Sequence, residues 1–324
     1  MAKVSDTRLT VAILLCTHNG AKFIVPQLDS FHAQTYDGWR LWASDDASAD
    51  ATVDILRQYQ VRWGTERLAI LAGPATGASA SSRPQSGASA NFLSLVCNPQ
   101  IQANAYAYAD QDDVWESNKL IRALAWLKTI PAHIPALYCS RTRLMDEGGS
   151  DIGLSPLFNR HPPSFANALA QNIGGGNTMV FNAAARALLL EAGGSVTIVG
   201  HDWWTYQLVT GCGGQVLYDP YPTVRYRQHE RQLVGSNVGV LARLSRAVLA
   251  FGGRFKSWTD INVRALERMR SRLTPENQRI FDLLHAARTG WLPGRLAALK
   301  KSGIHRQGFV DNVGLYIAVL LNRL

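Results

Sequence analysis

The stretch Val11-Ala-Ile-Leu-Leu-Cys-Thr-His-Asn-Gly20 indicates the fold, because a short apolar run ends there in a polar turn that closes with glycine. The residues after this turn place apolar side chains at Phe23, Leu28 and Phe31, which is the spacing of one face of a helix. A strand, a turn and a helix in this order form the first half of a βαβ unit. The stretch therefore predicts an α/β fold with a mainly parallel sheet.

Three further apolar runs are predicted to be strands of the same sheet, at Trp39–Ala43, Leu68–Leu71 and Ala105–Ala109. Apolar residues at helical spacing predict helices between and after these strands, including Asn91–Val96 and Ser117–Leu127. Ligands of parallel sheets bind beyond the carboxyl ends of the strands. We therefore expect the functional site where these strands end.

One long connection interrupts this alternation. The segment Gly73–Ala90 consists almost entirely of Gly, Ala, Ser, Pro and Thr, so we expect a flexible loop. It is longer than most connections in compact domains, and such loops are either disordered filler or flaps near a site.

Composition indicates a folded protein of a reducing compartment. The chain has 324 residues, of which 47% are hydrophobic, enough for one large α/β domain with a smaller attached region. The four cysteines are far apart and show no C-x-x-C spacing, which argues against a disulfide framework or a cysteine zinc site. The polar N-terminus does not resemble a signal peptide, and no apolar run approaches the ~20 residues that span a bilayer. We expect a cytoplasmic protein.

The net charge of +9 is concentrated at the C-terminal end of the chain. Residues 239–324 contain 15 Lys or Arg and 5 Asp or Glu, a balance of +10, which leaves residues 1–238 at −1. Aromatic residues such as Phe255, Trp258 and Trp291 interleave with these charges. The pattern fits amphipathic helices that contact an anionic membrane surface, at the inner face of the cytoplasmic membrane, and it fits equally a solvated basic face. A nucleic-acid partner is disfavoured because the basic residues are confined to this region.

The most informative polar segment is the acidic cluster that follows the strand Ala105–Ala109, Asp110-Gln-Asp-Asp-Val-Trp115. Three carboxylates in four positions repel one another unless a cation neutralises them. Mg²⁺ or Mn²⁺ suits such hard oxygen ligands, and these ions usually bridge carboxylates to substrate phosphates. An acidic turn that only caps the next helix is the alternative.

The motifs THNG, SDDASADAT, YADQDDVWESNKL, GGGNTMVFN, HDWW and YRQH occur in this order along the chain. In this order they resemble the inverting glycosyltransferases of family 2, and within that family the bacterial rhamnosyltransferase-like members. The resemblance covers roughly Val11 to Gly235. It implies a GT-A fold, a Rossmann-like mixed, mainly parallel sheet flanked by helices. A catalytic domain is then expected at residues 1–238, with the nucleotide-sugar part at about 1–115 and the acceptor part at about 116–238. A basic amphipathic helical region is expected at 239–324.

The resemblance also implies roles on the donor side. His18 would lie against the nucleotide base, Asp46 would accept a hydrogen bond from the base, and Asp110 would hold the ribose. Asp112 would ligate the metal, and Asp113 would support the site. The expected nucleotide-sugar site further includes Thr17, Asn19, Asn91 and Gln111.

On the acceptor side, Asp202 in the segment Gly200-His-Asp-Trp-Trp204 is expected to be the catalytic base that deprotonates the acceptor hydroxyl. Trp203 and Trp204 would exclude water and offer an apolar surface to a sugar ring. The alternative is a helix-capping aspartate beside two core tryptophans. His201, where many relatives have Glu, is expected to be structural.

Two further segments complete the expected site. Tyr226-Arg-Gln-His229 resembles the segment that brings a histidine to the metal, so His229 is a candidate metal ligand and Arg227 a candidate clamp for the diphosphate. The glycine-rich segment before Asn177 lacks the Lys-Ser or Lys-Thr of a P-loop. We interpret it as an acceptor-side loop in which Asn177 bonds sugar hydroxyls, or else as a plain turn before a strand.

The sequence therefore predicts a metal-dependent inverting glycosyltransferase. The expected donor is a dTDP or UDP sugar, with L-rhamnose from dTDP-rhamnose as the specific expectation. The expected acceptor is a saccharide or a lipid-linked glycan in bacterial surface polysaccharide synthesis, such as O-antigen, lipopolysaccharide or capsule. The alternatives are a nucleotide-sugar nucleotidyltransferase, which would need a basic phosphate loop that THNG does not provide, and a non-catalytic nucleotide-sugar-binding protein.

Overall fold

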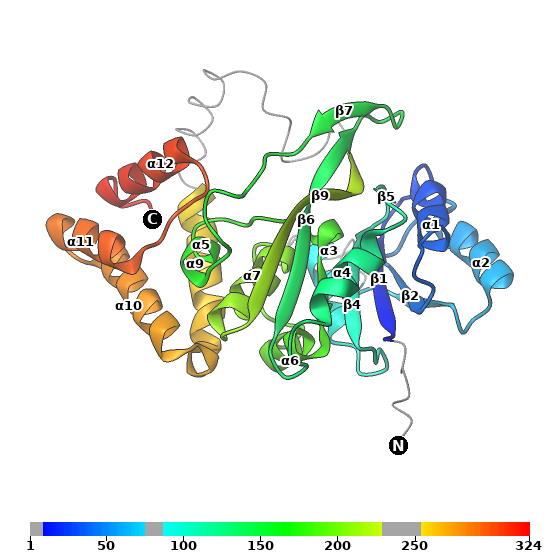
Figure 1. Ribbon diagram of the computed structural model, residues 1–324, viewed down its shortest axis with the longest axis horizontal. Coiled ribbons are helices and arrows are strands. Elements are labelled where there is room, and N and C mark those ends of the chain that lie inside the picture. Colours follow the sequence, from blue (N-terminus) through cyan, green and yellow to red (C-terminus); the bar gives the residue numbers. More distant parts are fainter. Residues whose placement is uncertain (1–8, 75–86, 229–253) are drawn as a thin grey trace.

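The computed structural model describes residues 9–74, 87–228 and 254–324, and Figure 1 shows a central sheet with helices on both sides. The sheet is mixed, with the strand order β3-β2-β1-β4-β8-β6-β9-β5, and β7 pairs with β6 at its edge. The strands are β1 (Val11–Thr17), β2 (Trp39–Asp45), β3 (Leu68–Ala72), β4 (Ala105–Asp110), β5 (Val114–Trp115), β6 (Ala136–Met145), β7 (Asp151–Leu154), β8 (Val180–Asn182) and β9 (Gln215–Arg227).

Helices cover both faces of this sheet and form the C-terminal end of the chain (Figure 1). The helices that alternate with strands are α1 (Ile24–His32), α2 (Thr52–Trp63), α3 (Gly87–Val96), α4 (Lys119–Leu127), α5 (Phe165–Ala168), the 3₁₀ turn η3 (Gly176–Thr178), α6 (Ala183–Ala192) and α7 (His201–Gly211). The C-terminal helices are α9 (Arg254–Arg268), the 3₁₀ turn η4 (Arg270–Arg272), α10 (Pro275–Thr289), α11 (Leu292–Ser302) and α12 (Phe309–Leu320).

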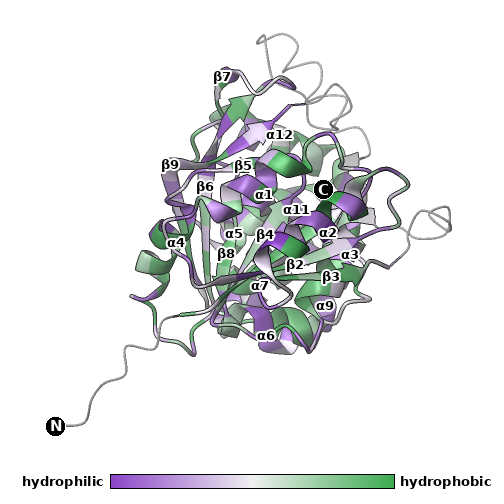
Figure 2. Cartoon of the chain, turned by 90° about the vertical axis from the view of Figure 1, so that its right-hand side faces the viewer, coloured by the Kyte–Doolittle hydropathy of each residue, from purple (hydrophilic) through white to green (hydrophobic). Residues whose placement is uncertain are grey.

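Strand β1 is buried on both faces because helices pack against each side of the sheet. Alternate residues of the strand enter different cores: Leu14 belongs to one hydrophobic cluster, and Ile13 and Leu15 belong to the other. In Figure 2, hydrophobic residues colour much of the central strands, and hydrophilic residues colour many of the outer segments. The continuous apolar run of β1 is thus explained by burial on two sides.

The parallel strands end together, as the sequence predicts. Strands β2, β1 and β4 are parallel neighbours, and Thr17 of β1 lies opposite Asp45 while Cys16 lies opposite Asp110. Neighbouring strands are about 4.8 Å apart, so the acidic ends of β2 and β4 lie about 10 Å apart with β1 between them. The expectation that both acidic ends share one edge of the sheet is confirmed.

The connection before α3 differs from the expectation. Residues 87–90 belong to α3, although a loop was expected through Ala90. The small residues of this segment fit a packed helix, since Ser89 is buried and contributes to the inner face of α3. The rest of the expected loop, residues 75–86, lies outside the described residues.

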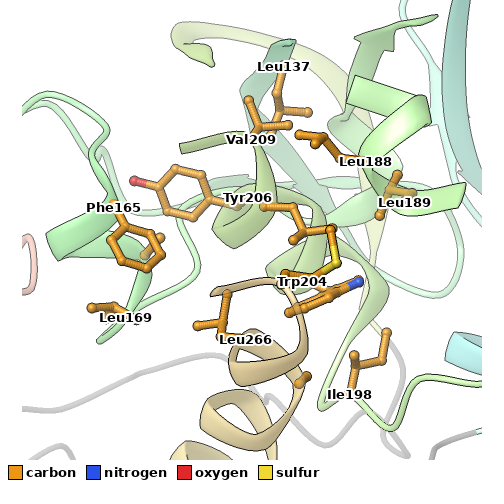
Figure 3. Packing of buried hydrophobic residues seen from close by; sticks show 14 of the residues in the cluster. Leu137, Phe165, Leu169, Leu188, Leu189, Ile198, Trp204, Tyr206, Val209 and Leu266 are labelled. Atoms are coloured by element: carbon orange, nitrogen blue, oxygen red, sulfur yellow. The ribbon is translucent and has the colours of Figure 1, made fainter. Parts of the chain in front are cut away.

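The C-terminal helices share a core with the sheet domain. Leu266 of α9 is fully buried beside Trp204 of α7, together with Ile198 and Tyr206 (Figure 3). Phe255, expected in a membrane-facing pattern, is instead buried at 7% exposure in this cluster. Within the described ranges, no helix is long and apolar enough to cross a membrane.

This shared core predicts that the C-terminal helices and the sheet unfold together. Leu266→Ala should lower the free energy of unfolding by about 2–5 kcal/mol, because it leaves a cavity between α9 and α7. Chemical denaturation followed by tryptophan fluorescence and by circular dichroism measures this loss, and the two signals should coincide. Val61→Ala is the matched control, since Val61 is 88% exposed and should change stability little. A separate early transition of the C-terminal helices would contradict the shared core.

Candidate active site

Hydrogen bonds at the ends of β1 and β2 fix the turn that carries Asp46. The Asp46 N–H donates to the Thr17 carbonyl at 2.8 Å. Asp45 accepts from the Thr17 hydroxyl at 2.7 Å and from the Ser48 N–H at 2.9 Å. Gly73 approaches the same turn so closely that a Cβ there would lie 2.8 Å from the Asp45 carbonyl oxygen. Thr17, expected in the nucleotide site, therefore holds this turn through Asp45.

The turns after β1 and β2 together hold the ring of His18 through both of its nitrogens. Nδ1 lies 2.7 Å from the Asp46 carbonyl oxygen, and Nε2 lies 3.1 Å from the Asn19 side-chain nitrogen. Because a carbonyl only accepts, Nδ1 carries the hydrogen and Nε2 accepts from Asn19. Gln111 bonds both main-chain groups of His18, at 2.9 and 3.0 Å. The exposed His18 ring is thus held in one orientation, and Gln111 links it to the acidic cluster.

Negative charge accumulates between β1 and β4. Burial and the neighbouring charges of Asp112 and Asp202 raise the pKa of Asp110 to about 7. The pKa of the buried Cys16 thiol is raised well above its ordinary value, first by burial and then by the charges of Asp110 and Asp46. The carboxylates expected on the donor side and the expected base, far apart in the sequence, therefore act electrostatically on one another.

A buried lysine supports this acidic cluster from inside. Asp113 is fully buried and accepts from the Asn177 side chain at 2.6 Å and from the Arg227 N–H at 3.2 Å. Burial followed by neighbouring carboxylates raises the Asp113 pKa. Lys119 is also fully buried, donates to the Asn177 carbonyl, and lies 3.4 Å from the centre of the Trp115 ring. Asn177, expected to bind sugar hydroxyls, is thus occupied by Asp113 and Lys119.

Lys119 is a site residue to which sequence reasoning assigned no role. Burial lowers its pKa, while the charges of Asp113 and Asp110 favour its protonated form. The feature of the sequence that could have indicated Lys119 was its position in the motif YADQDDVWESNKL, four residues after Trp115. A lysine at the start of a helix ordinarily indicates an exposed side chain, so burial could not be inferred.

Tyr226 is the second residue that the sequence analysis left without a role. The pKa of its phenol is raised by burial and then by the charges of Asp113, Asp110, Asp112 and Asp202. The phenol therefore stays protonated, and its O–H can donate a hydrogen bond between the acidic cluster and Asp202. The feature of the sequence that could have indicated Tyr226 was its position as the first residue of the YRQH motif.

Asp202 lies in the first turn of α7, where the partial positive charge of the helix N-terminus favours a carboxylate. Its Oδ1 accepts from the Trp203 N–H at 2.7 Å, and its Oδ2 accepts from the Asn172 side chain at 2.9 Å. Each oxygen keeps a further lone pair, so the carboxylate is oriented and still able to accept a proton. Asn172 is a positioning residue that no sequence motif indicated.

The two tryptophans after Asp202 do not form a wall for a sugar. Trp204 is fully buried in the core between α7 and α9 (Figure 3), and Trp203 is 7% exposed and donates to the Ala168 carbonyl at 2.7 Å. The helical period explains the difference, because successive residues of α7 both point inward when both sides of the helix are covered. His201 is structural in geometry: its ring stacks on Phe92 with centroids 3.9 Å apart, and burial lowers its pKa to about 4.

Arg227 holds the acidic turn where a phosphate clamp was expected. Its Nε donates to the Asp112 carbonyl at 2.9 Å, and one of its amino groups donates to the Glu147 carbonyl at 2.7 Å. The side chain is 5% exposed and covers the Phe23 ring at 4.8 Å. The guanidinium thus ties the β4–β5 turn to the β6–β7 turn.

Of two other expected residues, one is buried beneath the end of β2 and one lies outside the described chain. Asn91 is 2% exposed and bonds Ser44 through both its oxygen and its nitrogen, so it ties α3 to β2. His229 lies outside the described residues. Among residues 9–74, 87–228 and 254–324, no group of three or more His, Cys, Asp or Glu side chains is arranged to hold a metal ion.

A hollow on the described surface lies beside the β9 strand. It has a volume of about 430 Å³ and lies between β6, β7 and β9, where Arg143 and Arg225 contribute to its lining. Arg225 precedes Tyr226 in β9, and successive side chains of a strand point to opposite faces. The hollow therefore opens on the face of β9 that is turned away from the acidic cluster.

The chain is similar in sequence to known glycosyltransferases. Residues 12–81 match the family described as "Glycosyl transferase family 2", which covers the first three strands. The chain is 26% identical over 239 residues to the dTDP-rhamnosyl transferase RfbG of Shigella flexneri, a match that covers 72% of this chain and 77% of that protein.

Solved structures resemble the fold at low sequence identity. S. aureus TarS, residues 1–349, matches with a TM-score of 0.51 and 14% identity, over 91% of this chain and 90% of that one. GalNAc-T7, solved with UDP, GalNAc and Mn²⁺, matches with a TM-score of 0.50 and 11% identity, over 96% of this chain and 54% of that one.

The raised pKa of Asp110 predicts a pH dependence of stability in metal-free protein. Above pH ~4 the unfolded chain has lost a proton that the folded protein keeps until about pH 7. Stability should therefore fall as the pH rises through this window, by at most about 1.4 kcal/mol per pH unit from this group. Thermal unfolding in EDTA between pH 5 and 8 measures the slope.

Asp110→Asn should flatten this slope, because the amide does not ionise. Asp54→Asn, a change at an exposed side chain of α2, is the control and should leave the slope as it is. Equal slopes in wild-type protein and Asp110→Asn would show that Asp110 ionises normally.

Proposed function

We propose that this chain, which the comparisons identify as a family 2 glycosyltransferase with the GT-A fold, transfers a sugar with inversion from a nucleoside diphosphate to a hydroxyl group. The observation that carries the proposal is the electrostatic convergence of Asp110 and Asp112 with Asp202 at the carboxyl ends of the strands. A donor site and a catalytic base are the two parts that such a reaction needs.

The proposed donor site follows the sheet edge. The oriented His18 ring offers a flat surface for the base, and Asp46, in the neighbouring turn after β2, would accept a hydrogen bond from it. Asp110 at the end of β4 would accept from the ribose hydroxyls. The separation of about 10 Å between the ends of β2 and β4 suits a nucleoside laid across β1.

A divalent metal at Asp112 is part of the proposal. Mg²⁺ and Mn²⁺ are commonly held by one or two carboxylates together with substrate phosphates, so a three-residue protein cage is not required. The raised pKa of Asp110 and the neighbouring charge of Asp112 indicate a site that lacks positive charge. We propose Asp112 as the ligand, with His229 as a second. The metal, when bound, would stabilise negative charge on the departing diphosphate.

Asp202 is the proposed base. As the acceptor oxygen forms its bond to the anomeric carbon, the bond from that carbon to the phosphate oxygen breaks, and the hydroxyl proton moves to a carboxylate oxygen of Asp202. The Trp203 N–H and Asn172 fix the carboxylate for this transfer. Tyr226 can donate its O–H to the donor or to a carboxylate, while Lys119 and Arg227 hold the acidic turn in place.

The similarity to a dTDP-rhamnosyl transferase supports dTDP-L-rhamnose as the donor. We propose a growing surface polysaccharide or a lipid-linked glycan as the acceptor, with the enzyme in the cytoplasm and in peripheral contact with the membrane. A nucleotidyltransferase is less well supported, because the THNG turn after β1 contains no Lys or Arg.

Asp202→Asn tests the assignment of the base. Hydrolysis of dTDP-L-rhamnose to dTDP, with water as acceptor, should slow by about a hundredfold or more because general-base catalysis is lost. Affinity for dTDP should stay within about threefold of wild type, because the donor contacts are untouched. Asp54→Asn is the matched surface control. A variant that keeps wild-type turnover would remove Asp202 from the mechanism.

Tyr226→Phe tests the O–H group among the four carboxylates. It should lower kcat/KM by about tenfold to a hundredfold, the worth of one hydrogen bond to a charged group. Tyr221→Phe is the control, since Tyr221 lies in the same strand and borders the separate hollow. Unchanged kinetics in Tyr226→Phe would mean that the phenol only fills space.

A further inference from the structure

The C-terminal helix α12 has two apolar faces, and only one of them is buried. Its inner face consists of Leu315, Ala318 and Val319, which are at most 2% exposed. On the other side, seven apolar residues are between 41% and 68% exposed, and they form what we call the outer face of α12. These residues are Phe309, Val310, Val313, Tyr316, Ile317, Leu320 and Leu321.

The outer face is a continuous stripe. At about 100° per residue, its seven side chains occupy an arc of about 140° around the helix, opposite the inner face. Arg295 of α11 donates to the Val319 carbonyl, so the first turn of α11 lies beside the last turn of α12. That turn adds Trp291 and Leu292, which are 77% and 42% exposed. Folded proteins rarely leave so large an apolar patch in water unless it is a binding surface.

The charges around this stripe favour a negatively charged partner. Residues 283–324 contain six Lys or Arg and one acidic residue, Asp311. Lys300 and Lys301 precede α12, Arg323 follows it, and all three are exposed. A second copy of the chain would bring the same positive charge against this surface, which disfavours self-association. Anionic lipid headgroups attract juxtaposed Lys and Arg while the acyl boundary accepts the apolar side chains.

The helix α12 lies on the same side of the molecule as the proposed active site, so a membrane bound there could present a lipid-linked acceptor to the site. In Figure 1, α12 lies towards the upper side of the molecule, which is also the side at which β1 and β4 end. The helix has 12 residues and is about 18 Å long, too short for a hydrocarbon core of about 30 Å. It can therefore lie in the interface plane without spanning the bilayer.

We propose that the outer face of α12, flanked by Lys300, Lys301 and Arg323, docks the protein on an anionic bilayer surface. Phe309, Val310 and Val313 enter the boundary between headgroups and acyl chains, and the basic side chains contact the headgroups. This docking rests on the proposed function, whose peripheral membrane contact it assigns to one surface, and it does not depend on which donor the enzyme uses.

Sedimentation with lipid vesicles tests the docking surface. Wild-type protein should bind vesicles of phosphatidylcholine with about 30% phosphatidylglycerol and bind pure phosphatidylcholine much less. Val313→Asp combined with Ile317→Asp should lower the partition coefficient about tenfold or more, because it charges the centre of the stripe. Val61→Asp is the matched control, since Val61 is an 88% exposed valine on α2, and it should bind like wild type.

Phe309→Ser alone provides a milder second variant, and circular dichroism with thermal unfolding verifies that each variant is folded. Equal vesicle binding by wild type and both stripe variants would overturn the proposal. Wild-type protein that ignores vesicles, and forms a dimer in sedimentation velocity that Val313→Asp with Ile317→Asp dissolves, would assign the stripe to a second copy instead. Because no readout involves nucleotide or sugar, failure here is distinguishable from failure of the proposed transferase function.

Discussion

The concentration of carboxylates at the carboxyl ends of parallel strands is the constraint on which the rest of the site depends. Asp110, Asp112 and Asp113 follow one strand so closely that burial and mutual repulsion raise the pKa of two of them. Buried Lys119 offsets part of this repulsion, and Arg227 stabilises the turn by donating to the Asp112 carbonyl. A substrate that brings a cation would complete the neutralisation. The burial and mutual repulsion of the carboxylates, which destabilise the empty site, therefore favour binding of a metal diphosphate.

The base is positioned by the core. Asp202 starts α7, and the next two residues, Trp203 and Trp204, anchor that helix against α5 and α9. The C-terminal helices therefore do more than extend the chain, because Leu266 packs against the helix that carries the base (Figure 3). The same helical region presents the exposed stripe of α12, which links the support of the catalytic base to the proposed contact with a membrane.

Local patterns predicted the strands and their common edge well. VAILLC and AYAYA are continuous apolar runs, which is the pattern of strands buried on both faces, and the two strands are parallel neighbours. Segments that the motifs assigned to one site also lie near one another in the fold, since the charges of Asp112 and Asp202 act on Asp110. The tasks of single side chains were harder to predict. Trp204 and Arg227 are buried by segments distant in sequence, and Lys119 is enclosed by an element that only the fold brings near. Amphipathic periodicity could have indicated α12, but nothing in the pattern tells which of its two apolar faces is covered.

Calorimetric titration of the purified protein with dTDP, UDP and GDP, each with Mn²⁺ and with EDTA, tests the central claim most directly when it is repeated on Asp112→Asn. The account predicts tight binding of one nucleoside diphosphate, dTDP, that needs both the metal and Asp112. Equal binding in EDTA and in Asp112→Asn, or no binding of any of the three diphosphates, would contradict it, because the acidic cluster would then be a structural feature without a donor.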